Sequence, residues 1–239
     1  NDVRQTWVNN NYAMEGIVHK SEGDSHVDYW GITWQKVGHF NQIVRWPLAD
    51  VSAAQIPGYN FPYEHIDELL AHMTPVVNDG SAKFIGCDVS PCVFEMYFRL
   101  RGMDNALLDM AVDPELAHTM LGACADFAIT LASRACTQFH LDWLWTGDDV
   151  AGQESLLMGP SMWREQIQPH LKRVFDVAKK SEVWLVYHCC GSLRPIIGDL
   201  IEMGLDVLNP IQCDCQGMDP FELKREFGHQ LSFMGGVDT

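Results

Sequence analysis

The segment VWLVYHCCGSLRP, residues 183–195, joins an apolar run to one histidine and two cysteines. His188 and Cys190 are two residues apart, and such residues point to the same side of an extended strand. Imidazole nitrogen and thiolate sulfur are both good zinc ligands. The spacing therefore predicts that His188 and Cys190 are metal ligands and that Cys189, on the other side, packs inside the fold.

A buried histidine beside unreactive thiols is the alternative interpretation, because a tetrahedral zinc site needs further ligands. The segment QCDCQG offers Cys213 and Cys215, again two residues apart, after the next apolar run. Their spacing makes them ligand candidates, and ordinary loop thiols are the alternative for this pair.

Polar side chains also follow the other apolar runs. Asp88, Asp148 and Asp149 are predicted to be catalytic, because carboxyl groups at such positions act as general acids or bases or anchor a substrate. A solvated loop or a helix cap is the alternative for the pair Asp148 and Asp149. The residues predicted to bind substrate are Gln153, Asn209, Gln212 and Asp238.

The elements that must position these residues alternate along the chain. Short apolar runs such as KFIGCDV and VWLVYH are typical of strands buried on both faces, and helical patterns lie between them. In residues 114–138, Asp113 is the predicted helix cap and Pro114 occupies the first turn. The order predicts an α/β fold.

A (β/α)8 TIM barrel, incomplete in this chain, is favoured over an open doubly wound sheet. No glycine-rich phosphate loop follows a strand, and polar clusters end every strand, as at the mouth of a barrel. About five βα units are recognisable. We expect one domain over residues 1–239, with an irregular, aromatic-rich region at 1–60 and regular βα units at 83–239. The chain starts without methionine and stops after an apparent strand, so we expect a fragment lacking both ends.

Charge and composition exclude several classes of protein. Lys and Arg number 16 and Asp and Glu 32, giving a formal charge of −16. Such a surface repels nucleic acids and anionic membranes. No apolar run of about 18 residues predicts a transmembrane helix. The eight cysteines fall largely within apolar patterns, so we expect a reduced, cytoplasmic protein.

Several segments resemble the uroporphyrinogen decarboxylase superfamily over roughly residues 28–239. They are TGDDVAGQESLLMGPSMWREQIQPHLKRVFDVAK, HCCGSLRPIIGDLIEMGLDVLNPIQ, MDPFELKREFG and LSFMGGVDT, in that order. The resemblance implies a (β/α)8 barrel with its site at the C-terminal mouth. It also implies one of two chemistries.

One branch consists of methyltransferases that carry zinc on an H-x-C motif and a later cysteine, and that move methyl groups between a corrinoid and an acceptor. His188 and Cys190 match this motif, and the later cysteine would lie beyond Thr239. The other branch decarboxylates uroporphyrinogen acetate side chains without a cofactor, in porphyrin biosynthesis. There, a carboxylate such as Asp88 would stabilise a protonated pyrrole.

The strand-end residues include four acids and neither Arg nor Lys, which favours the methyltransferase over a carboxy-lyase with an octa-carboxylate substrate. A binding barrel that carries a corrinoid or tetrapyrrole without turnover is the third option. The resemblance admits a small-molecule, tetrapyrrole or corrinoid substrate, a corrinoid protein as partner and a homodimer as the assembly.

Overall fold

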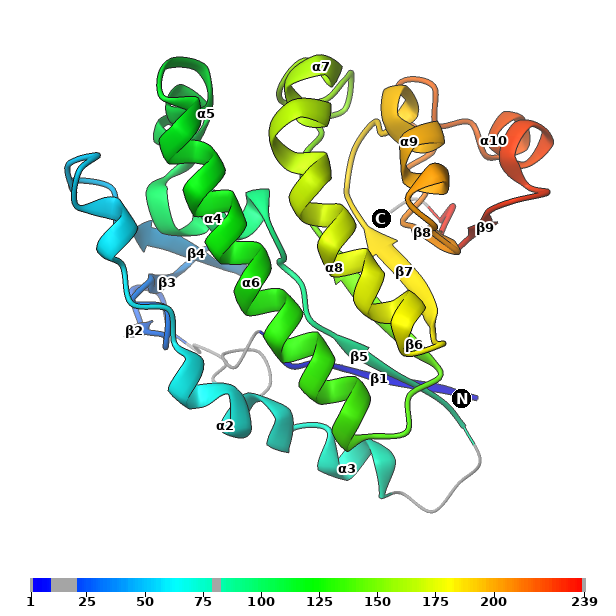
Figure 1. Cartoon of the computed structure of the whole chain (residues 1–239), viewed down its shortest axis with the longest axis horizontal. Coiled ribbons are helices and arrows are strands. Elements are labelled where there is room, and N and C mark those ends of the chain that lie inside the picture. The colour runs from blue at the N-terminus through cyan, green and yellow to red at the C-terminus, as the bar shows by residue number, and fades with distance from the viewer. Residues whose placement is uncertain (1, 10–20, 79–82, 238–239) are drawn as a thin grey trace.

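The computed structural model describes residues 2–9, 21–78 and 83–237. Its main sheet has six parallel strands in the order β1-β5-β6-β7-β8-β9 (Figure 1). Parallel neighbours need crossover connections, and helices supply most of them here. The strands are β1 (Val3–Trp7), β5 (Phe84–Asp88), β6 (Trp143–Gly147), β7 (Trp184–His188), β8 (Val207–Asn209) and β9 (Ser232–Phe233).

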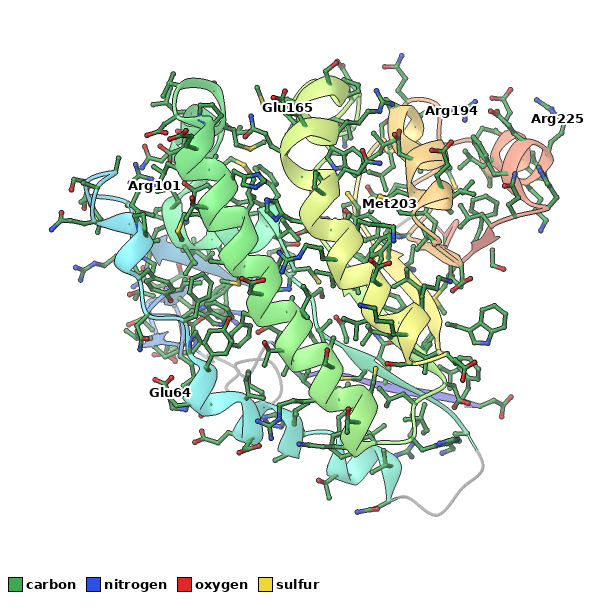
Figure 2. All side chains as sticks on the ribbon, in the orientation of Figure 1. Glu64, Arg101, Glu165, Arg194, Met203 and Arg225 are labelled. Carbon is green, nitrogen blue, oxygen red and sulfur yellow. The ribbon has the colours of Figure 1, made fainter. Side chains whose placement is uncertain are left out.

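Helices cover the sheet, and α6 and α8 lie side by side across it in Figure 1. Figure 2 shows side chains filling the space between these helices and the strands. The predicted α/β fold with parallel barrel strands is confirmed, and the described strands form an open sheet edged by β1 and β9. The helices after β5 are α4 (Phe94–Arg101), α5 (Met103–Val112), α6 (Pro114–Gln138), α7 (Pro160–Met162), a π-helical turn (Trp163–Ile167), α8 (Gln168–Lys180), η4 (Arg194–Ile196), α9 (Ile197–Glu202) and α10 (Pro220–Phe227).

Helix α6 begins as the sequence predicts. The Asp113 carboxylate accepts the Leu116 N–H over 3.2 Å, and Pro114 occupies the first turn. Among the described helices, α6 alone has the length and apolar composition that could cross a membrane. More than half of its apolar window is buried inside the fold.

The region 1–60, predicted to be irregular, contains four strands in its described part. β1 joins the main sheet beside β5, and β2 (Ser25–Val27), β3 (Thr33–Val37) and β4 (Phe40–Arg45) form a separate antiparallel sheet. β1 lacks the continuous apolar run that marks the inner strands, because it is an edge strand whose side chains are partly exposed. The remaining short elements are η1 (Ile56–Gly58), η2 (Tyr63–His65), α2 (Ile66–Ala71) and α3 (Thr74–Val77).

A buried ion pair fixes the segment that follows β4. Arg101 Nε donates to Asp109 Oδ2 over 2.8 Å, and Arg101 Nη1 donates to the carbonyl oxygen of Leu48 over 2.7 Å. The Arg101 side chain, labelled in Figure 2, thereby ties α4 to the N-terminal region. Removing one partner of such a buried pair leaves an uncompensated charge.

One face of the sheet carries several tryptophan side chains, which come from β1 and β6. Trp7, Asp88 and Trp145 lie in one row across β1, β5 and β6. A Cβ on Gly86 would lie 1.4 Å from Trp143 Nε1, so only glycine at this position leaves room for that indole ring.

Candidate functional site

Three side chains converge at the C-terminal ends of β6 and β7. Asp149, His188 and Cys190 each offer a ligand atom, and all these atoms lie within 4.8 Å of one another. Cys190 Sγ is 3.6 Å from His188 Nε2. Gly147 and His188 are register partners in neighbouring parallel strands, so the strand ends bring Asp149 beside the H-x-C motif.

Asn209 on β8 orients the imidazole. His188 and Asn209 are register partners, and His188 Nδ1 lies 2.7 Å from Asn209 Oδ1. The Asn209 Nδ2 group donates to the Met234 carbonyl over 3.1 Å, which turns the amide oxygen toward the ring. The contact assigns the proton to Nδ1 and leaves Nε2 with a free lone pair. The Trp145 ring lies against the imidazole, with centroids 6.2 Å apart and planes 28° apart.

The two adjacent thiols have different environments. Cys189 is fully buried, and its Sγ accepts the Val150 N–H over 3.4 Å. Cys190 is half-buried and belongs to the cluster, and its N–H donates to Asp149 Oδ1 over 2.8 Å. The alternation of a strand thus separates the two sulfur atoms as predicted.

Gly191 lets the chain turn away directly after Cys190. Its φ is +90°, and a Cβ there would lie 2.5 Å from the Gly152 carbonyl oxygen. Its N–H donates to Gln212 Oε1 over 2.6 Å. Gln212, predicted to bind substrate, therefore supports the backbone of the cluster in this structure.

The surroundings of Cys190 favour its neutral thiol. Burial raises the pKa of Cys190 to about 11, and the charges of Asp149 and Glu95 contribute further. A thiol with this pKa stays protonated at neutral pH. A bound metal ion would offset this penalty, because coordination deprotonates a thiol.

A cavity of about 350 Å³ opens beside the cluster. Asp88 lies in its wall, and Asp88 Oδ1 accepts the Ser90 N–H and hydroxyl over 2.9 and 2.7 Å. Burial raises the pKa of Asp88 to about 7 against these hydrogen bonds. The lining residues are Trp7, Asp88, Ser90, Glu95, Arg99, Trp145, Asp149 and His188.

Asp148, predicted to be catalytic, lies outside this lining. Its carboxylate is fully buried and accepts the N–H groups of Val93 and Glu95 over 2.9 and 3.0 Å. It therefore caps the N-terminal end of α4. Burial raises the pKa of Asp148 to about 8.

The other predicted site residues lie outside the described cluster of Asp149, His188 and Cys190. The Gln153 side chain is exposed, and its carbonyl accepts the Gln216 N–H over 2.9 Å. Cys213 is exposed, and Cys215 Sγ lies 3.7 Å from Gln212 Oε1, so neither belongs to the described cluster. Asp238 lies outside the described residues.

Glu95 and Arg99 line the cavity, although neither was predicted, because neither directly follows an apolar run that predicts a strand. Glu95 Oε2 accepts the Asp149 N–H over 3.1 Å, and Glu95 Oε1 accepts from Arg99 Nη2 over 2.6 Å. The strand-end residues include neither Arg nor Lys, and α4 adds the guanidinium of Arg99 to the cavity. The i,i+4 spacing of Glu95 and Arg99 at the start of the helix after β5 was the available signal.

Comparisons with known proteins bear on this geometry. A model of the family uroporphyrinogen decarboxylase (URO-D) matches residues 35–239. Among solved structures, a methyltransferase from Methanosarcina mazei is similar with a TM-score of 0.68 and 15% sequence identity. The match covers 95% of this chain and 66% of that chain, so the chain spans just under two thirds of its length, and the likeness concerns the fold. No curated protein matches the sequence.

Proposed function

The chain belongs to the uroporphyrinogen decarboxylase family, and we propose that it is a zinc-thiolate methyltransferase of that family. It would transfer methyl groups between a corrinoid and an acceptor. The observation that carries the proposal is the convergence of Asp149, His188 and Cys190, with the free Nε2 of the imidazole 3.6 Å from the Cys190 thiol.

The donor set fits zinc. One nitrogen, one sulfur and one carboxylate oxygen are the ligands that zinc takes in proteins, and catalytic sites use three protein ligands with one open position. His188, Cys190 and Asp149 would hold the ion, and Asn209 would support His188 from behind. Bound zinc supplies a Lewis acid that lowers the pKa of a substrate thiol.

Asp88 is the cavity residue suited to proton transfer. Its pKa of about 7 means that the carboxyl can take up or release a proton near neutral pH. It shares the cavity wall with His188, so we assign to it the proton that an acceptor thiol gives up. Trp7 and Trp145 form the apolar part of that wall.

Decarboxylation of uroporphyrinogen is the second candidate, and the position of Asp88 in the cavity favours it. A carboxylate there could stabilise a protonated pyrrole. The rest of the cavity lining disfavours decarboxylation of uroporphyrinogen, because three carboxyl groups face a single guanidinium that is already paired with Glu95. A polycarboxylate substrate would be repelled. Incubation with uroporphyrinogen and product analysis decide between the candidates.

We also propose a corrinoid protein as partner, a homodimer as the assembly and a cytoplasmic location. All eight cysteines are free thiols in the structure, which supports a reducing compartment. Size-exclusion chromatography with light scattering, alone and with a methylated corrinoid protein, tests the assembly.

The central experiment combines metal analysis with methyl transfer. The purified protein should carry about one zinc per chain and lose it in Cys190→Ala, whereas Cys189→Ala should retain it. Methyl transfer from methylcobalamin to a small thiol should follow the zinc content. A wild-type content below about 0.1 zinc per chain, with unchanged transfer in Cys190→Ala, would refute the proposal.

A further inference from the structure

Glu95 lies beside the metal cluster without belonging to it. Only 8% of the residue is exposed, and its Oε2 accepts the backbone N–H of Asp149 over 3.1 Å. Carboxylates are zinc ligands in proteins, and Glu95 lines the same cavity as Asp149 and His188, so a released Glu95 side chain could fill the fourth position of a tetrahedral site.

Arg99 binds the carboxylate of Glu95. Arg99 Nη2 donates to Glu95 Oε1 over 2.6 Å, and the two side chains are 18% and 11% exposed. Charge-assisted hydrogen bonds are stronger than neutral ones, and low exposure protects this one from solvent screening. With Oε2 on the Asp149 N–H and Oε1 on the guanidinium, both oxygens of Glu95 have partners and its charge is neutralised.

Two indole rings restrain Arg99 in turn. The guanidinium carbon lies 6.0 Å from the centroid of the Trp7 ring and 5.6 Å from that of Trp34. Trp34 Nε1 donates to Asp28 Oδ2 over 2.8 Å, and Trp7 Nε1 donates to the Ser90 carbonyl oxygen. The rings are therefore fixed from β1 and β3, and cation–π attraction keeps the guanidinium where it is.

We propose that Arg99 holds Glu95 out of the coordination of the metal and so keeps one coordination position open for the substrate thiol. The inference rests on the proposed metal site and adds a positioning role for the Arg99–Glu95 pair. It explains why a carboxylate can sit beside the ligands without closing the site. It also gives the N-terminal antiparallel sheet a part in the site, through Trp34.

Cobalt(II) in place of zinc tests the proposal without measuring turnover. Its absorption spectrum reports the number of ligands, and 2-mercaptoethanol adds a sulfur-to-cobalt charge-transfer band when it binds. In Arg99→Met, Glu95 is released, so metal affinity should rise while the affinity for 2-mercaptoethanol falls by at least about tenfold. In the double variant Arg99→Met/Glu95→Gln, thiol binding should return to within about threefold of wild type.

Two control variants and a check of folding make the outcome decisive. Arg164→Met removes an exposed arginine that pairs with Asp199 away from the cavity, and it should leave both affinities unchanged. Arg99→Lys retains the positive charge and should retain thiol binding. Circular dichroism checks that each variant folds.

The outcomes separate this inference from the proposed function. A wild type that binds no cobalt overturns the metal site and the inference with it. A wild type that binds cobalt, with Arg99→Met taking up thiol equally well, overturns the inference alone. A loss of thiol binding in Arg99→Met that Glu95→Gln fails to restore overturns it as well, because the defect then does not come from Glu95.

Discussion

Removing the acceptor that orients His188 should weaken metal binding without removing a ligand. His188 Nδ1 lies 2.7 Å from Asn209 Oδ1, and this contact leaves Nε2 as the free nitrogen beside Cys190. In Asn209→Ala the ring loses its partner, so its tautomer is no longer set. Loss of such a partner costs about 10–100-fold in metal affinity, or about 1.4–2.7 kcal/mol.

We expect the loss of zinc affinity in Asn209→Ala to lie in the lower part of that range. The Trp145 ring still lies against the imidazole and restricts its plane after the substitution. We therefore expect about 10–30-fold weaker zinc binding. The assay is competition for zinc with a chromophoric chelator at neutral pH.

Asn209→Asp is the matched control. It retains an acceptor for Nδ1 and loses the donor to the Met234 carbonyl. Its zinc affinity should equal or exceed that of the wild type, since a carboxylate is the stronger acceptor. If Asn209→Ala binds zinc as tightly as the wild type, the orienting role of Asn209 is refuted. If both variants weaken binding equally, the bond to Met234 matters instead.

Further predictions concern the thiols, the packing and the pH dependence of stability. Cys190→Ser should abolish stoichiometric zinc binding, while Cys189→Ala should retain it and lose about 1 kcal/mol of unfolding free energy in urea. Gly86→Ala forces a Cβ into the Trp143 ring and should cost about 1–3 kcal/mol in the same assay, and an unchanged midpoint would contradict this packing. Burial raises the pKa of Asp148 to about 8 in the folded protein, against about 3.9 in the unfolded chain. The contribution of Asp148 to stability is therefore complete below the unfolded pKa and is lost as the pH rises through about 8. Asp148→Asn should flatten that decline in urea titrations between acidic and alkaline pH.

The sequence predicted the H-x-C pair because its geometry is local. Residues two apart on a strand share a side whatever the rest of the fold does, so His188 and Cys190 converge and Cys189 does not. Their partner Asn209 is also predictable in part, since it ends the next strand and parallel neighbours align their ends.

The same alternation, applied to the end of β6, separates the two aspartates. Trp145, Gly147 and Asp149 share one side of the extended chain, and Trp145 and Asp149 both line the cavity. Asp148 falls on the other side, against the helices, and caps α4. The spacing along the strand therefore already indicates that Asp149 faces the cavity and that Asp148 faces the helices.

Glu95 and Arg99 could not be found in this way. Both lie on α4, and which side of a helix meets the barrel mouth depends on how the helix packs on the sheet. Trp7 was equally hidden, because β1 is an edge strand of mixed polarity and its pairing with β5 is a contact between distant segments. Alternation along a single strand carries no information on such contacts, and the i,i+4 spacing of Glu95 and Arg99 does not say which side of α4 meets the cavity.

The environments of Cys189 and Cys190 bear differently on the alternative of a buried histidine with inert thiols. Cys189 fits that view, because it is fully buried and its sulfur has a backbone partner. Cys190 is half-buried and lies beside His188 and Asp149, where burial first, and then the charges of Asp149 and Glu95, raise its pKa and disfavour the thiolate. Arg99 compensates only Glu95. Acids beside a thiolate are unfavourable unless a cation accompanies them, so the divalent metal that we propose for Asp149, His188 and Cys190 would offset the cost of bringing these residues together.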